Sequence, residues 1–174
     1  MEKKKIGVKL LVAALILSMS IGAMPVYAAQ VQTDASAQQQ TQQESSVAEK
    51  AAHYFANFPA DKHVVSAASF LEKVAAGEDI CVLDIRSADD YAAGHVQGAI
   101  NVPYGVAVAE SLEKIPDDIP VMVYCYSGQT ASQTIALLNL AGKNAYNVSG
   151  GFNNGISKEQ AAAGLMSTAE STFG

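Results

Sequence analysis

The stretch Val121-Met122-Val123-Tyr124-Cys125-Tyr126-Ser127-Gly128-Gln129-Thr130 decides the fold of this chain of 174 residues. Its first four residues are β-formers introduced by Pro120, as in a buried central strand. Residues 131–141 have the composition of a helix and are followed by Gly142, a typical residue after a helix C-terminus. Between them lies a tight turn of small residues. The sequence therefore predicts a strand, a cysteine, a turn and a helix in succession.

Cys125 lies where that strand ends and the turn begins. Backbone N–H groups in such a turn point at the first side chain, and the N-terminus of the following helix adds positive potential. These contacts lower the pKa of a cysteine by roughly one to several units. We therefore interpret Cys125 as a reactive thiolate at the carboxyl edge of a parallel sheet, where α/β proteins place their ligand sites. The alternative is an inert apolar cysteine that ends a core strand.

The composition limits the possible classes of function. Hydrophobic residues make up 49 % of the chain and charged residues 16 %, which indicates one globular domain. The formal net charge is −6, and without residues 1–28 seven basic and sixteen acidic residues leave a net charge of −9. Such an acidic body is not expected to bind nucleic acid or an anionic membrane surface. No second cysteine or histidine lies at ligand spacing, so neither a metal site nor a cofactor is expected.

The first 28 residues resemble a secretory signal peptide. Lysines precede an apolar run that begins at Leu10, and Val26-Tyr27-Ala28 fits a small-x-small cleavage pattern. We predict cleavage after Ala28 and an extracytoplasmic protein, either secreted or held in the periplasm or cell envelope. The alternative is an uncleaved anchor over residues 6–29, which is the only membrane contact expected. Residues 29–46 are rich in Gln, Ser and Thr and are predicted to form a flexible linker.

The remaining chain divides into a helical extension (residues 47–61), a folded domain (residues 62–157) and a C-terminal tail (residues 158–174). Strands and helices alternate in the domain, which indicates an α/β fold with a mostly parallel sheet and helices on both faces. The predicted strands cover residues 63–65, 80–85, 99–102, 121–124 and 145–148. The predicted helices cover residues 67–76, 88–93, 106–114 and 131–141.

Four sequence motifs occur in a fixed order. They are Leu83-Asp84-Ile85-Arg86, Tyr-Ala-Ala-Gly-His-Val-Gln-Gly-Ala-Ile-Asn-Val-Pro at 91–103, Val123-Tyr124-Cys125, and Gly150-Gly151-Phe152. With this order and spacing, residues 63–154 resemble the rhodanese-like sulfurtransferases. The resemblance implies a five-stranded parallel α/β domain in which Cys125 accepts a sulfane sulfur as a persulfide. It also implies that loop N–H groups surround this sulfur, and the loop residues are Tyr126, Ser127, Gly128, Gln129 and Thr130.

The chain departs from that family at positions near the cysteine that carry charge in other members. Positions 126, 127 and 130 are neutral, where many members have a cation. Asp90 stands where some members that use thiosulfate have an arginine. These departures weaken the binding of an anionic donor. The sequence therefore does not decide whether the sulfur donor is thiosulfate, an organic persulfide or a polysulfide. Cysteine phosphatase or arsenate-reductase chemistry is not expected, because position 131 is Ala where those enzymes need an arginine.

Asp84 and Arg86 end their strand at the same edge as Cys125 and, by the resemblance, shape the floor of the site. For Arg86 we prefer a structural ion pair, with assistance to anionic donors as a further hypothesis. We interpret His95 as a residue that fixes its loop rather than as a catalytic base. The resemblance makes the strands of Cys81 and Cys125 parallel neighbours, which places the two Cα atoms roughly 13 Å apart. Since a disulfide needs about 7 Å or less, Cys81 is expected to be buried and Cys125 free.

The predicted function is the transfer of sulfane sulfur through Cys125 to a thiophilic acceptor such as a thiol, cyanide or sulfite. The expected partners are this small donor and acceptor, and a protein acceptor is not identified. One alternative is a non-catalytic or redox-sensing module that binds a protein partner. A second is a thiol oxidoreductase, which is disfavoured because the chain has no Cys-x-x-Cys.

Overall fold

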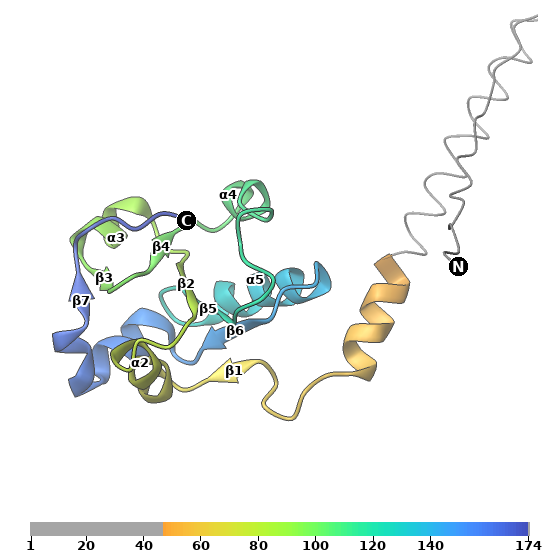
Figure 1. Cartoon of the computed structure of the whole chain (residues 1–174), viewed down its shortest axis with the longest axis horizontal. Coiled ribbons are helices and arrows are strands. Elements are labelled where there is room, and N and C mark those ends of the chain that lie inside the picture. Colours follow the sequence, from red (N-terminus) through yellow and green to blue (C-terminus); the bar gives the residue numbers. More distant parts are fainter. Residues whose placement is uncertain (1–46, 174) are drawn as a thin grey trace, which may run out of the picture. The chain divides into compact units, whose positions relative to one another are not determined.

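A five-stranded parallel sheet forms the centre of the described residues, which are 47–173 of this computed structural model (Figure 1). The strand order is β1-β6-β5-β2-β4. The strands are β1 (Val64–Val65), β2 (Cys81–Asp84), β4 (Ile100–Asn101), β5 (Val121–Tyr124) and β6 (Ala145–Val148). The predicted five-stranded parallel α/β fold is therefore confirmed. The predicted signal peptide and linker lie outside the described residues.

Four labelled helices connect these strands: α2 (Ala67–Ala75), α3 (Ala88–Ala93), α4 (Val106–Glu110) and α5 (Gln129–Leu140). A further helix covers residues 47–56. Helix α5 begins two residues earlier than predicted, because Gly128 has a φ of 90° and ends the preceding turn directly before Gln129. Gln129 and Thr130 are therefore in the first turn of the helix. Within residues 47–173 no helix has the length and apolar character needed to cross a membrane.

Two apolar clusters cover the two faces of the sheet, with α2 on one face and α5 on the other. The cluster under α2 contains Phe70, Leu71, Val82, Met122, Tyr124 and Val148, and the cluster under α5 contains Leu83, Val121, Val123, Cys125, Ile135 and Leu138. Successive residues of β2 and β5 alternate between the two clusters, as they do in a strand that is covered on both faces. This packing fixes the carboxyl end of β5, from which Cys125 extends toward the α5 side.

The described part of the predicted C-terminal tail packs against the domain. It contains a 3₁₀ turn (Gln160–Gly164) and β7 (Met166–Ser167), which pairs antiparallel with β3 (His95–Val96). Ala162 is buried in the cluster under α2. The backbone N–H of Ser171 donates to the Tyr91 hydroxyl at 3.2 Å. The segment is therefore an integral part of the domain, which its Ala- and Ser-rich sequence did not indicate.

Aromatic contacts join the helix over residues 47–56 to the domain. The Tyr54 and His63 rings stack with their centroids 5.9 Å apart. His63 in turn packs edge-on against Tyr146 of β6, with the centroids 5.5 Å apart. The helix is thus anchored at the β1 edge of the sheet, which Figure 1 places away from β4.

Candidate functional site

Cys125 directly follows β5, the central strand of the sheet, and its sulfur is surrounded by hydrogen-bond donors. The backbone N–H of Gly128 donates to Cys125 Sγ at 3.1 Å. The N–H groups of Ser127 and Ala131 and the Thr130 hydroxyl are the other donors that act to lower the pKa of the thiol. Because Cys125 is only 2 % exposed, these protein donors take the place of water around the sulfur.

The pKa of the Cys125 thiol is lowered by this arrangement. Burial alone would raise the pKa, but the hydrogen bonds from Thr130, Ala131, Ser127 and Gly128 outweigh burial and hold the pKa below its usual value. The thiolate form is therefore favoured, in the direction that the sequence predicted. The donors differ from the predicted set, because Ala131 joins them from the first turn of α5.

A π-helical turn (Gly151–Gly155) is hydrogen-bonded to the backbone of the cysteine loop. The N–H of Phe152 donates to Cys125 O at 2.7 Å, and the N–H of Asn153 donates to Tyr126 O at 2.9 Å. These bonds fix two peptide groups of the loop by their carbonyl ends. The N–H groups that follow are thereby directed toward the sulfur side of the loop.

Gly151 is required for the close approach of this turn to the loop. It has a φ of 57°, and a Cβ at this position would lie 2.5 Å from Cys125 O and 2.7 Å from the nitrogens of both Ser127 and Gly128. Any larger residue must displace the peptide groups that bond to the sulfur. Gly151 is therefore a positioning residue, which the sequence indicated only as part of the Gly150-Gly151-Phe152 motif.

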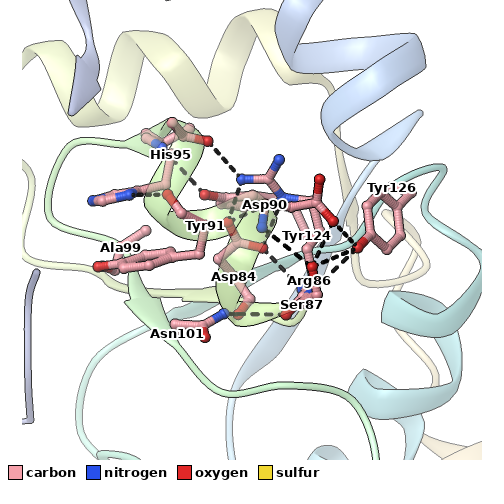
Figure 2. Close-up of polar contacts among 12 residues, drawn as sticks. Asp84, Arg86, Ser87, Asp90, Tyr91, His95, Ala99, Asn101, Tyr124 and Tyr126 are labelled. Carbon is pink, nitrogen blue, oxygen red and sulfur yellow. Dashed lines mark hydrogen bonds and ion pairs between the residues drawn. The ribbon is translucent and has the colours of Figure 1, made fainter. Parts of the chain in front are cut away.

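Asp84 and Arg86 form a buried ion pair at the end of β2 (Figure 2). Arg86 Nη2 lies 2.6 Å from Asp84 Oδ2, and Arg86 Nε donates to Asp84 Oδ1 at 3.0 Å. Arg86 Nη2 also donates to Gly94 O at 2.8 Å. The guanidinium group stacks on the Phe152 ring at 3.8 Å, and Arg86 is 4 % exposed. This geometry favours the structural interpretation of Arg86 over direct contact with a donor.

His95 lies in β3 and is fully buried. Its Nδ1 lies 2.8 Å from Tyr91 O and its Nε2 lies 3.0 Å from Ala169 O, while its ring stacks on Tyr91 at a centroid distance of 3.6 Å. Both ring nitrogens thus contact backbone rather than Cys125, which fits the loop-fixing interpretation. In the described part of the chain, no group of three His, Cys, Asp or Glu side chains is arranged to hold a metal ion.

Tyr126 extends from the cysteine loop to the first turn of α3, as Figure 2 shows. Its hydroxyl donates to Asp90 Oδ2 at 2.5 Å and accepts the N–H of Ser87 at 3.1 Å. The Ser87 hydroxyl donates to the same Asp90 oxygen at 2.5 Å. The sequence indicated Asp90 as an acidic residue at a position where some members of the family have an arginine, but it did not indicate the bonds of Asp90 and Ser87 to the cysteine loop.

Cys81 lies at the opposite end of the sheet from Cys125. It begins β2, where it pairs in register with Val121, four residues before Cys125. Burial raises the pKa of the Cys81 thiol to about 11. Both cysteines are free thiols, so the prediction that they do not pair is confirmed.

Comparisons with known proteins identify the family to which the domain is similar. Residues 66–158 match the family described as the rhodanese-like domain. A thiosulfate sulfurtransferase GlpE of Pseudomonas entomophila is 37 % identical over 76 residues, which cover 43 % of this chain and 69 % of the relative. GlpE of Coxiella burnetii is 36 % identical over 76 residues, which cover 42 % of this chain and 69 % of the relative. The chain thus spans about two thirds of the length of these curated relatives.

A solved structure supports the fold alone. The rhodanese-like domain of an Anabaena protein, determined by NMR in solution, matches with a TM-score of 0.52 at 21 % sequence identity. The match covers 61 % of this chain and 79 % of that domain.

Proposed function

Because the chain belongs to the rhodanese-like domain family, we propose that it is a sulfurtransferase in which Cys125 accepts a sulfane sulfur as a persulfide and passes it on. The observation that carries this proposal is the set of donors around Cys125 Sγ, with the Gly128 N–H at 3.1 Å. The relatives named thiosulfate sulfurtransferase support the reaction class.

In the first step, the Cys125 thiolate attacks the sulfane sulfur of the donor. The S–S bond of the donor breaks, and its electron pair leaves with sulfite or a thiolate, depending on the donor. A new S–S bond joins the transferred sulfur to Cys125. This step needs no general acid, because both leaving groups are stable as anions.

In the second step, a thiophilic acceptor such as cyanide or a thiolate attacks the outer sulfur of the persulfide. The S–S bond to Cys125 breaks, and its electron pair returns to the cysteine as a thiolate. A thiolate whose pKa is lowered is the better leaving group, so the donors that favour attack in the first step also favour release in the second. The N–H groups of the loop and the first turn of α5 stabilise the anionic sulfur in between.

The burial of Cys125 restricts the form of the donor. Since the residue is 2 % exposed, a donor has to present its sulfane sulfur at one end of the molecule. Thiosulfate and persulfides meet this requirement. A sulfur in the middle of a long organic polysulfide does not.

Mass spectrometry of the purified protein tests this function. After incubation with thiosulfate, inorganic polysulfide or an alkyl persulfide, we expect one added sulfur atom on the peptide that contains Cys125. Addition of cyanide should remove that sulfur and release thiocyanate. Cys125→Ser should acquire no sulfur, whereas Cys81→Ala should behave like the wild type. A wild-type protein that acquires sulfur from none of the three donors would overturn the proposal.

We also propose that residues 1–28 export the protein and are removed after Ala28. The support is the lysine-rich start, the apolar run and the small-x-small pattern at residues 26–28. Intact-mass measurement on protein from the native host is the test, with an N-terminus at Ala29 as the expected result. A mass that includes Met1 would contradict cleavage.

A further inference from the structure

The residue that follows Cys125 in sequence is hydrogen-bonded to a carboxylate in the first turn of α3. Tyr126 is adjacent to Cys125 in sequence and is 39 % exposed, whereas Cys125 itself is 2 % exposed. Its hydroxyl donates to Asp90 Oδ2 at 2.5 Å (Figure 2). This bond, together with the bond from the Ser87 hydroxyl, fixes the orientation of the Asp90 carboxylate and links it to the cysteine loop through Tyr126.

Asp90 carries its negative charge at neutral pH. Hydrogen bonds from Ser87 and Tyr126 lower the pKa of the exposed Asp90 carboxyl, and the charge of Arg86 lowers it further. The carboxylate therefore stays ionised through the pH range in which Cys125 is expected to work.

No exposed cation of the surrounding elements, as far as the structure describes them, is paired with this charge. The loop and first helical turn from Cys125 to Ala131 contain no Lys or Arg, and neither does the π-helical turn Gly151–Gly155. Arg86 is buried and paired with Asp84 at 2.6 Å, so its effect on the Asp90 carboxylate is smaller than that of the hydrogen bonds from Ser87 and Tyr126. Asp89, next to Asp90 in the first turn of α3, adds a second negative charge. Among the charged side chains described around the cysteine loop, Asp89 and Asp90 are thus not paired with a cation, and they attract cations and repel anions that approach the loop.

We propose that Asp90, held by Tyr126, selects sulfur donors that carry a positive charge near the sulfane sulfur and disfavours dianions such as thiosulfate. This inference rests on the proposed function and names the donor class that the same site prefers. An ammonium-bearing persulfide meets both requirements, because its sulfane sulfur is terminal and its cation faces the Asp90 carboxylate.

A matched pair of donors isolates the effect of charge. Persulfides of cysteamine and of 3-mercaptopropionate present the same reacting group on chains of similar length, with an ammonium group at the far end of one and a carboxylate at the far end of the other. The attack on either donor breaks its S–S bond and releases the parent thiolate, while the sulfane sulfur becomes bound to Cys125. We expect the kcat/KM of the wild type to favour the cysteamine persulfide by about tenfold at low ionic strength, and by less in high salt.

Two variants separate Asp90 from its neighbour. Asp90→Asn keeps a side-chain oxygen for the Tyr126 hydroxyl and removes the charge, so the preference should fall toward equal rates. Asp89→Asn removes a charge of the same helical turn that has no bond to Tyr126, so most of the preference should remain. Equal rates in the wild type, or the same preference in wild type and Asp90→Asn, would overturn the inference.

Alkylation of Cys125 provides a readout that does not depend on sulfur transfer. The anionic iodoacetate should react more slowly relative to neutral iodoacetamide in the wild type than in Asp90→Asn, with the rates followed on the Cys125 peptide. An unchanged ratio would contradict the inference. If the persulfides place no sulfur on Cys125 while the alkylation ratio changes as expected, then the proposed function fails and the charge selectivity stands.

Discussion

Two cysteines of this protein lie in one apolar cluster. Relative to an ordinary cysteine, the pKa of one thiol is raised and the pKa of the other is lowered. Burial raises the pKa of the Cys81 thiol to about 11. The pKa of the Cys125 thiol is lowered, although Cys125 is the less exposed of the two, at 2 % against 8 %. Burial alone therefore does not decide how easily a thiol ionises in this protein.

The two thiols differ in pKa because the two ends of a parallel sheet provide different contacts to a side chain. Cys81 begins β2, and its surroundings provide apolar contacts. Cys125 follows β5 at the opposite end, where the chain turns into α5 and directs N–H groups toward it. Hydrogen bonds to the charged form can outweigh desolvation, and here they come from backbone and a single hydroxyl. The comparison thus predicts that substitutions affecting these donors change the chemistry, and that substitutions at Cys81 do not.

Replacement of either cysteine by alanine should give the largest contrast. Cys125→Ala removes the nucleophile, so thiocyanate formation should fall by roughly 1,000-fold or more. Cys81→Ala should retain the activity and cost about 1 kcal/mol of stability, because it removes one small buried group. The measurements are cyanide-dependent thiocyanate formation and urea unfolding. Loss of activity in Cys81→Ala with unchanged stability would show that both ends of the sheet take part in the reaction.

Gly151→Ala should reduce the difference in pKa between the two thiols, although neither cysteine is substituted. The added Cβ collides with the peptide groups of the loop and moves the N–H donors away from the sulfur. A misplacement of about 1 Å costs roughly 100-fold in rate, and the pKa of Cys125 should rise with it. The thiolate pKa can be measured by ultraviolet absorbance in a Cys81→Ala background.

Gly142→Ala is the matched control for this experiment. Gly142 also has a positive φ, of 97°, but no atom lies within 4 Å of a Cβ at that position. The variant therefore introduces backbone strain without a collision near Cys125. A pKa that rises equally in both variants would show that general destabilisation, rather than displacement of the donors, is responsible.

Thr130→Val should have a smaller effect on Cys125. The substitution removes one hydroxyl donor and leaves the N–H groups in place, so the pKa of the thiol should rise, but less than in Gly151→Ala. The rate at neutral pH should fall by up to about tenfold, because less thiolate is present. Thr134→Val, one turn further along α5, removes a hydroxyl that donates to Thr130 O at 3.0 Å and should leave the pKa of Cys125 nearly unchanged.

The smallest expected effect concerns the pH dependence of stability at Cys81. The pKa of this thiol is about 11 in the folded protein and lower in the unfolded chain, so the unfolded chain loses its proton first as the pH rises. Stability should therefore fall between the unfolded pKa and about pH 11, and Cys81→Ala should remove that part of the slope. Urea unfolding of both proteins at several alkaline pH values is the measurement. Parallel slopes would show that Cys81 does not titrate differently in the folded state.

The sheet was predictable because its strands and helices carry local signals. Apolar runs, glycines and prolines located β2, β5, β6 and the helices between them, and a cysteine at the end of β5 indicated the site. Two elements carry no such signal. The pairing of β3 with β7 joins two strands of two residues each that lie about seventy residues apart, and no periodicity can be read from such short strands.

The remaining parts of the site depend on contacts between distant segments. Gly151 is needed because its turn meets the loop of residues 125–128, and neither segment shows this requirement by itself. Asp90 and Ser87 satisfy the rules of a helix N-terminus, which conceals their bond to Tyr126, 36 residues further along. Local patterns thus pointed to Cys125, and tertiary packing determined which residues surround it.

The sulfur of Cys125 is surrounded mainly by peptide groups rather than by charged side chains. Salt screens the interactions of charged side chains but affects peptide dipoles at contact distance much less, so the thiolate should persist across a wide range of ionic strength. The side chains of Ser127 and Gln129 point to solvent while their backbone shapes the loop. Substitutions there can change which molecules approach the sulfur without removing its reactivity. Donor preference and nucleophile strength can therefore evolve separately in this protein.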